Sequence, residues 1–199
     1  MSPQWRAWAV TTVAYDSQDT LSFVCALSSL LPPIIVVFIA GIASCAGAFQ
    51  ADRALLLLVA LVQNAMLNSV LKKTIRMQRP SSSVYEAVPL SNLSPYGMPS
   101  DHTQFMFFFI TWLMRKASAD RIPLPLSLRL FFLFSAALVA FGRVYNSFHT
   151  TEQVVVGALI GVVNGILSTT PFVESKLYLV AVHLMPIRDF CTSWVVCIR

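Results

Sequence analysis

Charged residues are scarce in this sequence, and acidic residues are scarcer still. Of its 199 residues, 12% are charged and only 9 are Asp or Glu, whereas 56% are hydrophobic. Because soluble domains carry about 25% charged residues, this composition excludes an ordinary soluble domain. The apolar residues come in runs of about 20, the length at which a helix crosses the hydrocarbon core. We therefore predict an all-α fold, a polytopic membrane helix bundle, in which residues 1–199 form a single integral membrane domain.

Cysteine is also scarce, and basic residues form no continuous block. None of the 4 cysteines has the spacing with His or Asp that zinc ligation requires, so we expect buried or free thiols rather than a metal site. The net charge of +5 could indicate nucleic-acid binding. The basic residues form no tail or stripe, however, but cluster at the ends of the apolar runs. That pattern favours membrane orientation and anion binding, with no nucleic acid as partner.

The apolar runs predict about five spanning helices after one interfacial helix. The interfacial helix is expected at about 21–31, and the spans at about 33–49, 54–73, 101–117, 128–144 and 152–169. In the last span, Gly157, Gly161 and Gly165 recur every four residues, which permits close contact with another helix. The apolar run around residues 178–185 is too short to cross the bilayer.

One face of the second span is polar. Asn64, Asn68 and Lys72 are spaced by four residues, so they share one side of the helix. A polar stripe in lipid should point into the bundle. Hydrogen bonding between helices is our main interpretation for the two asparagines.

Three fragments place cationic or imidazole groups at the mouths of apolar helices. They are Lys72 with Arg79-Pro80, Pro99-Ser100-Asp101-His102, and Arg143 with His149. One charged group at the bilayer centre costs roughly 2.5–3.5 kcal/mol. With five spans, the ends of the second and fourth and the starts of the third and fifth lie on the same side. The fragments are therefore predicted to meet in space.

Such a meeting point suits a phosphoryl group, which needs distributed positive charge and an in-line nucleophile. His149 could attack phosphorus, and His102 could protonate the leaving oxygen. Ser100 and the first N–H groups of the third span would add donors. Each of these residues alone could instead be an interfacial anchor or pair with a lipid headgroup. The cations that could bind the phosphoryl oxygens are Lys72, Arg79 and Arg143.

Lys and Arg are unevenly divided between the two predicted sides of the membrane. The side opposite the fragments has Arg53, Arg115, Lys116, Arg121, Arg129, Lys176, Arg188 and Arg199. With the three candidate ligands set aside, the fragment side has Arg6, Lys73 and Arg76. Because cytosolic loops are rich in Lys and Arg, the site is predicted to face the lumen or exterior. Asn92 begins an N-glycosylation sequon in a loop on that side.

The spacing of the fragments resembles the type 2 phosphatidic acid phosphatase superfamily, whose pattern is K-x6-R-P, then P-S-G-H, then S-R-x5-H-x3-D. Lys72 to Arg79-Pro80 matches the first part fully. The second part matches except at Asp101, and the third except at Gly142 and Gln153. The resemblance covers about residues 54–169, which we take as the catalytic core.

The residues around these motifs are similar to the dolichyl pyrophosphate phosphatase family. The signs are Gly97-Met98-Pro99-Ser100, His102-Thr103-Gln104-Phe105-Met106 and Arg143-Val144-Tyr145. The resemblance implies hydrolysis of dolichyl diphosphate to dolichyl phosphate and phosphate, with no metal or cofactor. It further implies a location at the lumenal face of the endoplasmic reticulum membrane, where the carrier lipid for protein N-glycosylation is recycled. The implied partners are a polyprenyl diphosphate substrate and the lipid bilayer.

The same resemblance implies a role for each residue. His149 is expected to form a phosphohistidine, with His102 as the acid. Gln153 stands where the superfamily has Asp, one turn after His149, and its carboxamide oxygen can accept Nδ1–H and fix the tautomer. The residues expected to bind phosphate are Lys72, Arg79, Ser100 and Arg143.

Asp101 stands in the phosphate-binding segment where the superfamily has Gly. A carboxylate there would repel a phosphate. Our main interpretation is a helix N-cap, with Gln104 reaching back as in a capping box. The alternative is a catalytic or diphosphate-sensing role. Gly142 in place of Ser would remove only an accessory hydroxyl.

Two other functions stay open from the sequence. The charge cluster does not distinguish a monophosphate from a diphosphate, so the substrate could be phosphatidate, another lipid phosphate or another polyprenyl diphosphate. The departures at Gln153 and Asp101 would also fit a lipid-phosphate binder without catalysis. Nothing in the sequence indicates an oligomeric state.

Overall fold

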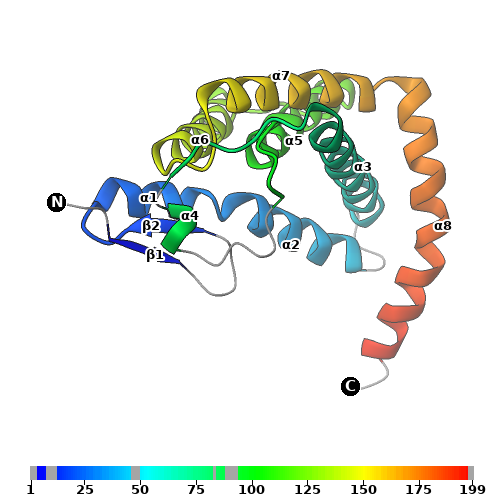
Figure 1. The fold of residues 1–199 in the computed structure, drawn as a ribbon. Helices are drawn as coiled ribbons and strands as arrows, with labels where there is room; N and C mark the ends of the chain where they lie inside the picture. The colour runs from blue at the N-terminus through cyan, green and yellow to red at the C-terminus, as the bar shows by residue number, and fades with distance from the viewer. Residues whose placement is uncertain (1–3, 8–12, 46–49, 83, 88–93, 197–199) are drawn as a thin grey trace.

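The computed structural model describes residues 4–7, 13–45, 50–82, 84–87 and 94–196, and most of them are helical (Figure 1). The helices are α1 (Thr20–Ser28), α2 (Leu31–Ser44), α3 (Ala51–Ile75), α4 (Val84–Ala87), α5 (Asp101–Ala119), α6 (Leu126–Tyr145), α7 (Thr151–Ser168) and α8 (Pro171–Val196). Two three-residue strands, β1 (Trp5–Ala7) and β2 (Ala14–Asp16), pair antiparallel with Arg6 opposite Tyr15. The sequence analysis did not predict these strands.

Four apolar segments of the described chain are long enough to cross a membrane. They are Thr20–Ser44, Ala51–Ile75, Leu126–Tyr145 and Thr151–Ser168. The polytopic all-α prediction is therefore confirmed. The predicted third span forms α5, but it is not among the four. α5 carries Asp101, Arg115 and Lys116, and it packs against α3, α6 and α7 at once, so much of its surface faces protein.

The start of the first span differs from the prediction. α1 and α2 follow one another along one side of the molecule (Figure 1), and together they form one apolar stretch of 25 residues. The predicted separate interfacial helix is thus the first part of a candidate span. Pro32 and Pro33 occupy the first turn of α2, where a missing N–H costs little. They therefore begin a new helix, and the apolar segment continues through them. Residues 46–49, the predicted end of this span, lie outside the described residues.

Close packing of α5 on α7 depends on the three glycines of α7. A Cβ added at Gly157 would lie 2.7 Å from the carbonyl oxygen of Ser100, and one at Gly165 would lie 2.9 Å from Cβ of Thr111. One at Gly161 would collide with the carbonyl oxygen of Gln104. The predicted close helix contact is confirmed. It sets the N-terminal ends of α5 and α7 side by side.

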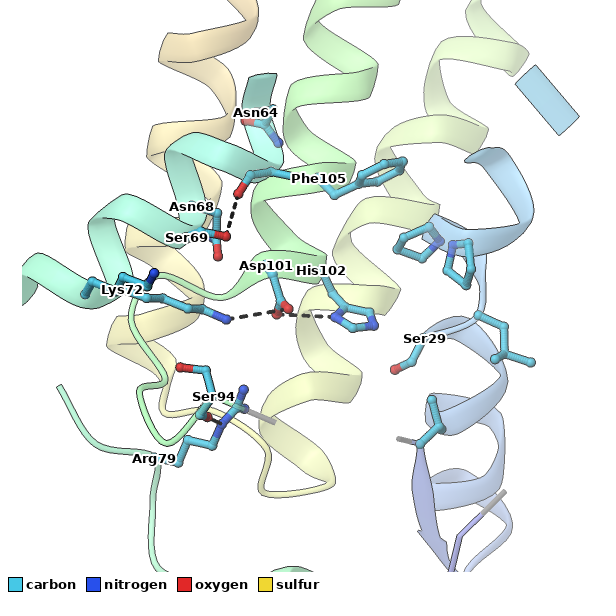
Figure 2. A pocket seen from close by; sticks show the side chains of 16 residues that line it. Ser29, Asn64, Asn68, Ser69, Lys72, Arg79, Ser94, Asp101, His102 and Phe105 are labelled. Carbon is cyan, nitrogen blue, oxygen red and sulfur yellow. Dashed lines mark hydrogen bonds and ion pairs between the residues drawn. The ribbon is translucent and has the colours of Figure 1, made fainter. Parts of the chain in front are cut away.

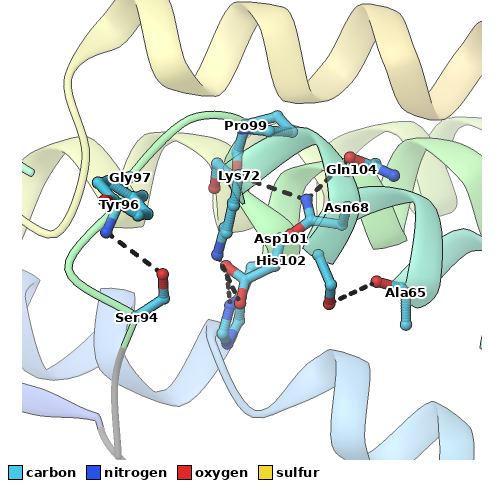
Figure 3. A network of polar contacts seen from close by, with 12 residues as sticks. Ala65, Asn68, Lys72, Ser94, Tyr96, Gly97, Pro99, Asp101, His102 and Gln104 are labelled. Atoms are coloured by element: carbon cyan, nitrogen blue, oxygen red, sulfur yellow. Dashed lines mark hydrogen bonds and ion pairs between the residues drawn. The ribbon is translucent and has the colours of Figure 1, made fainter. Parts of the chain in front are cut away.

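A chain of buried amides joins α3, α5 and α7. Nδ2 of Asn68 donates to Oε1 of Gln104 at 2.8 Å, and Nε2 of Gln104 donates to Oδ1 of Asn64 at 3.0 Å. Nδ2 of Asn164 donates to the same Asn64 oxygen at 2.9 Å. These bonds confirm that both asparagines of α3 bond between helices. Figure 3 shows Asn68 between Gln104 and the backbone of Pro99.

Gly142 has a packing role that the sequence did not reveal. It lies in α6 against α1, where an added Cβ would be 3.1 Å from both Cβ and the carbonyl oxygen of Cys25. A serine at this position would be crowded, so the change from the superfamily pattern affects helix packing rather than an accessory hydroxyl alone. The described cysteines Cys25, Cys45 and Cys191 are free thiols, as expected; Cys197 lies outside the described residues.

Candidate active site

The three fragments meet in space, as the topology predicts. Lys72 lies in the last turns of α3, Asp101 begins α5, Arg143 lies in the last turn of α6, and His149 precedes α7. The loop after α3 is tied to the segment before α5 by a bridge between Gln78 and Tyr96. The helix ends therefore surround one small volume inside the bundle.

His149 is held in one orientation and one tautomer. Its Nδ1 lies 2.9 Å from the carbonyl oxygen of Gly97 and 3.2 Å from Oε1 of Gln153. Both neighbours are acceptors, so Nδ1 carries the hydrogen and Nε2 keeps its lone pair. Burial lowers the pKa of His149 well below its usual value, and the charge of Arg143 lowers it further. The ring is therefore neutral at neutral pH, the form in which a histidine can act as a nucleophile.

Gln153 is fixed by the start of α7. Its side chain completes a capping box with Thr150, in which Thr150 Oγ1 accepts from the Gln153 N–H at 3.3 Å. Nε2 of Gln153 donates to the carbonyl oxygen of Gln78 at 2.7 Å, which turns Oε1 toward His149. The glycine at position 97 makes room, because a Cβ there would overlap this amide. The geometry is the orienting contact expected from the sequence, with the Gly97 carbonyl as a second acceptor.

Three cations surround the imidazole of His149. Nη1 of Arg79 lies 3.2 Å from Nε2 of His149 and donates to the carbonyl oxygen of Phe148 at 3.1 Å. Arg143 is 2% exposed, and its guanidinium stacks 4.1 Å from the centroid of the Phe148 ring. Its Nε is buried without a hydrogen-bond partner in the described part of the chain. Lys72 is 7% exposed and faces the same space. Buried cationic donors of this kind suit an anion such as phosphate.

Ser100 is fully buried at the N-terminus of α5. Its Oγ lies 3.1 Å from Oγ1 of Thr103, and its N–H donates to the carbonyl oxygen of Gln153 at 3.0 Å. The second bond ties the start of α5 to the start of α7. Because the Ser100 hydroxyl already contacts Thr103, it could donate to a phosphate only while Thr103 donates to it or after that contact is broken.

The N-cap interpretation of Asp101 is wrong. Ser100, with φ −66° and ψ 118°, is the cap residue of α5, and among the described residues no side chain caps this helix. Asp101 is the first helical residue, and Gln104 bonds to α3 instead of reaching back. The Asp101 carboxylate points to Lys72 and His102 (Figure 2), with Oδ2 3.5 Å from Nζ of Lys72 and Oδ1 3.4 Å from Nδ1 of His102.

A cavity of about 650 Å³ opens beside these groups. One end is polar and includes Arg79, Asp101 and His102. The rest of the lining comes from α2, α3, α5 and the turn before α2, and its apolar members are Leu30, Pro32, Pro33, Ala65 and Phe105. The polar side chains of Asn64 and Ser69 lie on the same side as Phe105 (Figure 2). No group of three or more His, Cys, Asp or Glu side chains in the described ranges is arranged to hold a metal ion. The cavity could thus hold a molecule with a phosphate head and an apolar tail.

Two site residues were missed in the sequence. The Gly97 carbonyl, which holds Nδ1 of His149, is a backbone group and carries no side-chain signal. Phe148, under the Arg143 guanidinium, reads in the sequence as one more apolar residue. Its position directly before the histidine was the only available sign.

Comparison with known proteins identifies the family of this chain. The profile of the PAP2 superfamily matches residues 53–175, and the chain belongs to this superfamily. It is 32% identical to Dolichyldiphosphatase 1 of Dictyostelium discoideum over 162 residues, which are 78% of this chain and 67% of that protein. No solved structure shows a significant match.

Two further relatives differ in their names. Dolichyldiphosphatase of Saccharomyces cerevisiae is 32% identical over 166 residues, 78% of this chain and 65% of that protein. Lipid phosphate phosphatase gamma of Arabidopsis thaliana is 28% identical over 183 residues, 88% of this chain and 76% of that protein. The chain spans about two thirds of the length of the dolichyldiphosphatases it matches. The resemblance to the dolichyl pyrophosphate phosphatase family is confirmed.

Proposed function

We propose that this protein hydrolyses dolichyl diphosphate to dolichyl phosphate and inorganic phosphate, without a metal, through a phosphohistidine on His149. The observation that carries the proposal is the buried neutral imidazole, held at Nδ1 by two acceptors, with Nε2 3.2 Å from Nη1 of Arg79 and 3.8 Å from Oδ1 of Asp101. The names of the relatives support the substrate.

The reaction has two steps. Nε2 of His149 attacks the terminal phosphorus, the bond from phosphorus to the bridging oxygen breaks, and that oxygen takes the proton of His102. Water then attacks the phosphohistidine, returns its proton to His102 and releases inorganic phosphate. Arg79 exchanges its bond to Nε2 for phosphate oxygens, and Lys72 and Arg143 complete the charge stabilisation. Ser100 adds a hydroxyl donor. Such preorganised donors supply much of the rate acceleration in phosphoryl transfer.

The lipid tail would lie along the apolar end of the cavity. Phosphates at Lys72 and Arg79 leave the first isoprene units between Phe105 and Ala65, and the chain then passes Pro33 at the start of α2. Helix α2 exposes large apolar side chains such as Val37 and Phe38, so a tail leaving this end would enter lipid.

Filling the apolar end should impair long substrates selectively. We expect Ala65→Trp to lower kcat/KM for dolichyl diphosphate by about tenfold or more, roughly 1.4 kcal/mol, since the indole would occupy the space proposed for the tail. Hydrolysis of a diphosphate with a single isoprene unit should change little. Met66→Trp, on the adjacent outward face where Met66 is 65% exposed, is the matched control. Equal losses with both substrates would contradict this path for the tail.

A second candidate substrate is a lipid monophosphate. The name of the Arabidopsis relative favours it, and the cations would bind either headgroup. Purified protein in vesicles should be assayed with chelator against dolichyl diphosphate, another polyprenyl diphosphate and phosphatidate. We expect phosphate release with the highest kcat/KM for dolichyl diphosphate. Preference for phosphatidate would support the second candidate, a strict metal requirement would overturn the mechanism, and tight binding without turnover would indicate a binder.

The site is proposed to face the lumen of the endoplasmic reticulum, where the product would re-enter the carrier-lipid cycle of protein N-glycosylation. The excess of Lys and Arg at the opposite ends of the helices supports this orientation. Several of these residues are paired there, as in Lys116 with Glu174 at 2.7 Å. Asn92 of the sequon lies outside the described residues.

A further inference from the structure

Asp101 has no part in the steps above, although its carboxylate lies among the groups that carry them out. Of the described residues that line the cavity, it is the only Asp or Glu. Its side chain is 43% exposed to the cavity, whereas that of His149 is fully buried. The superfamily pattern has Gly at this position, so a carboxylate here is a feature of this chain that the shared mechanism does not explain.

The contact between Asp101 and His102 is unusual for neighbours in a helix. Side chains at successive helical positions point about 100° apart and do not ordinarily face each other. At the first turn of α5 both turn into the same cavity, with Oδ1 of Asp101 3.4 Å from Nδ1 of His102. Nζ of Lys72 holds the other carboxylate oxygen at 3.5 Å (Figures 2 and 3). The carboxylate is thus oriented from both sides.

The contact selects one nitrogen of His102. A carboxylate only accepts, so Nδ1 of His102 must carry a hydrogen when it is bonded to Asp101. The second nitrogen, Nε2, is then the one that can give a proton to a leaving oxygen. Hydrogen bonds in sites without substrate are often long and tighten in the reacting complex, so 3.4 Å is compatible with this role.

The charge around His102 makes a counter-ion necessary. A general acid must hold its proton before the reaction begins, yet a protonated imidazole is disfavoured beside other cations. The groups that face this space are Lys72 from α3, Arg79 from the following loop, Arg143 from α6 and His149 from the loop before α7. Asp101 is the negative charge among them.

We propose that Asp101 is a positioning residue for general acid catalysis, which holds Nδ1–H of His102 and keeps the second proton on Nε2. This proposal rests on the proposed function for what the proton does. When the bond from phosphorus to the bridging oxygen breaks, the electron pair stays on that oxygen, which takes the proton from Nε2. His102 becomes neutral with Nδ1–H still on Asp101, the form needed to accept a proton from water in the second step. Asp101 stays ionised throughout.

The first test needs no turnover. The chain has 3 histidines, so nitrogen NMR of histidine-labelled full-length protein in detergent can follow His102 after assignment with His149→Gln and His183→Gln. We expect Asp101→Asn to move the titration midpoint of His102 to lower pH by about one unit or more, and Asp101→Glu to restore part of it. Asp120→Asn removes the same charge at the other end of α5 and should leave the midpoint unchanged.

The second test uses kinetics. Asp101→Asn should move the basic limb of the kcat/KM profile, set by His102, to lower pH. The acidic limb, set by His149, should move to lower pH as well, because Oδ1 of Asp101 lies 3.8 Å from Nε2 of His149. Its loss should be larger for phosphatidate than for dolichyl diphosphate, because an alkoxide is a poorer leaving group than a phosphate and needs the acid more. A profile that falls equally at every pH would point to a purely structural role and overturn the proposal.

The outcomes separate this proposal from the proposed function. If the protein is an active phosphatase but the titration midpoint of His102 does not move in Asp101→Asn, the proposed role of Asp101 is refuted and the proposed function stands. If the titration midpoint of His102 moves in Asp101→Asn but the protein has no phosphatase activity, the contact between Asp101 and His102 is supported and the proposed function is refuted. Tighter binding of inorganic phosphate to Asp101→Asn, with the titration midpoint of His102 unmoved, would overturn the proposal. It would mean that the Asp101 carboxylate only competes with phosphate for the surrounding cations.

Discussion

His149→Ala is expected to abolish phosphate release from lipid phosphates, a loss of about 10⁴-fold or more in kcat, as when the nucleophile of a covalent mechanism is removed. Nε2 of His149 keeps its lone pair and lies 3.2 Å from Nη1 of Arg79, and an alanine side chain supplies no nucleophilic atom in its place. The residual binding groups alone do not provide a nucleophile. Release of phosphate from dolichyl diphosphate, measured over a long incubation at high protein concentration, is the direct assay.

The matched control is His183→Ala. His183 lies exposed on α8, where Nδ1 contacts the carbonyl oxygen of Leu179 at 2.7 Å, so its removal should leave activity unchanged. Brief reaction with substrate carrying a radiolabelled terminal phosphate, followed by alkaline quench, should label the wild-type protein and His183→Ala but not His149→Ala. Activity that survives in His149→Ala, or label retained on that variant, would contradict the phosphohistidine mechanism.

The meeting of Lys72, Arg143 and His149 was predictable because it follows from the order of the helices. Alternating spans return every second helix end to the same side, so residues far apart in sequence become neighbours without knowledge of any side-chain position. The orienting role of Gln153 was predictable for a similar reason, since one helical turn separates it from His149. Regular geometry and residue type were sufficient in both cases.

The details that depend on single turns of backbone were not predictable. Asp101 is a good N-cap residue by type, but the extended backbone of Ser100 shifts the cap by one position and frees the carboxylate. The Gly97 carbonyl reaches His149 through an irregular segment with no periodic signal. Strands β1 and β2 span only three residues each, too short for alternation to stand out. The order of the helices thus predicts where the site lies, whereas the local backbone conformation determines which polar groups contact the two histidines.

Arg143→Lys is expected to lower kcat/KM for dolichyl diphosphate by roughly 100- to 1,000-fold, the effect of losing one preorganised donor to a developing oxyanion. The substitution keeps a positive charge but removes the planar fork that matches phosphate oxygens. It also removes the guanidinium that stacks on Phe148 at 4.1 Å and whose Nε has no protein partner in the described chain. A buried donor without a partner costs free energy unless a ligand satisfies it, so we expect a phosphate oxygen to accept from this nitrogen.

Two variants separate phosphate binding from packing. Arg129→Lys, at the exposed N-terminal end of the same helix α6, should leave kcat/KM unchanged. Phe148→Leu keeps the guanidinium but removes the ring beneath it, and we expect a smaller loss of about tenfold, since a cation–π contact contributes about 0.5–2 kcal/mol. Thermal unfolding of each variant should be followed in parallel. If Phe148→Leu loses as much activity as Arg143→Lys with no change in unfolding temperature, the orientation of the Arg143 guanidinium by the Phe148 ring contributes as much as its planar shape. If Arg143→Lys behaves like Arg129→Lys, the guanidinium serves packing on Phe148 and the phosphate is bound by Lys72 and Arg79 without it.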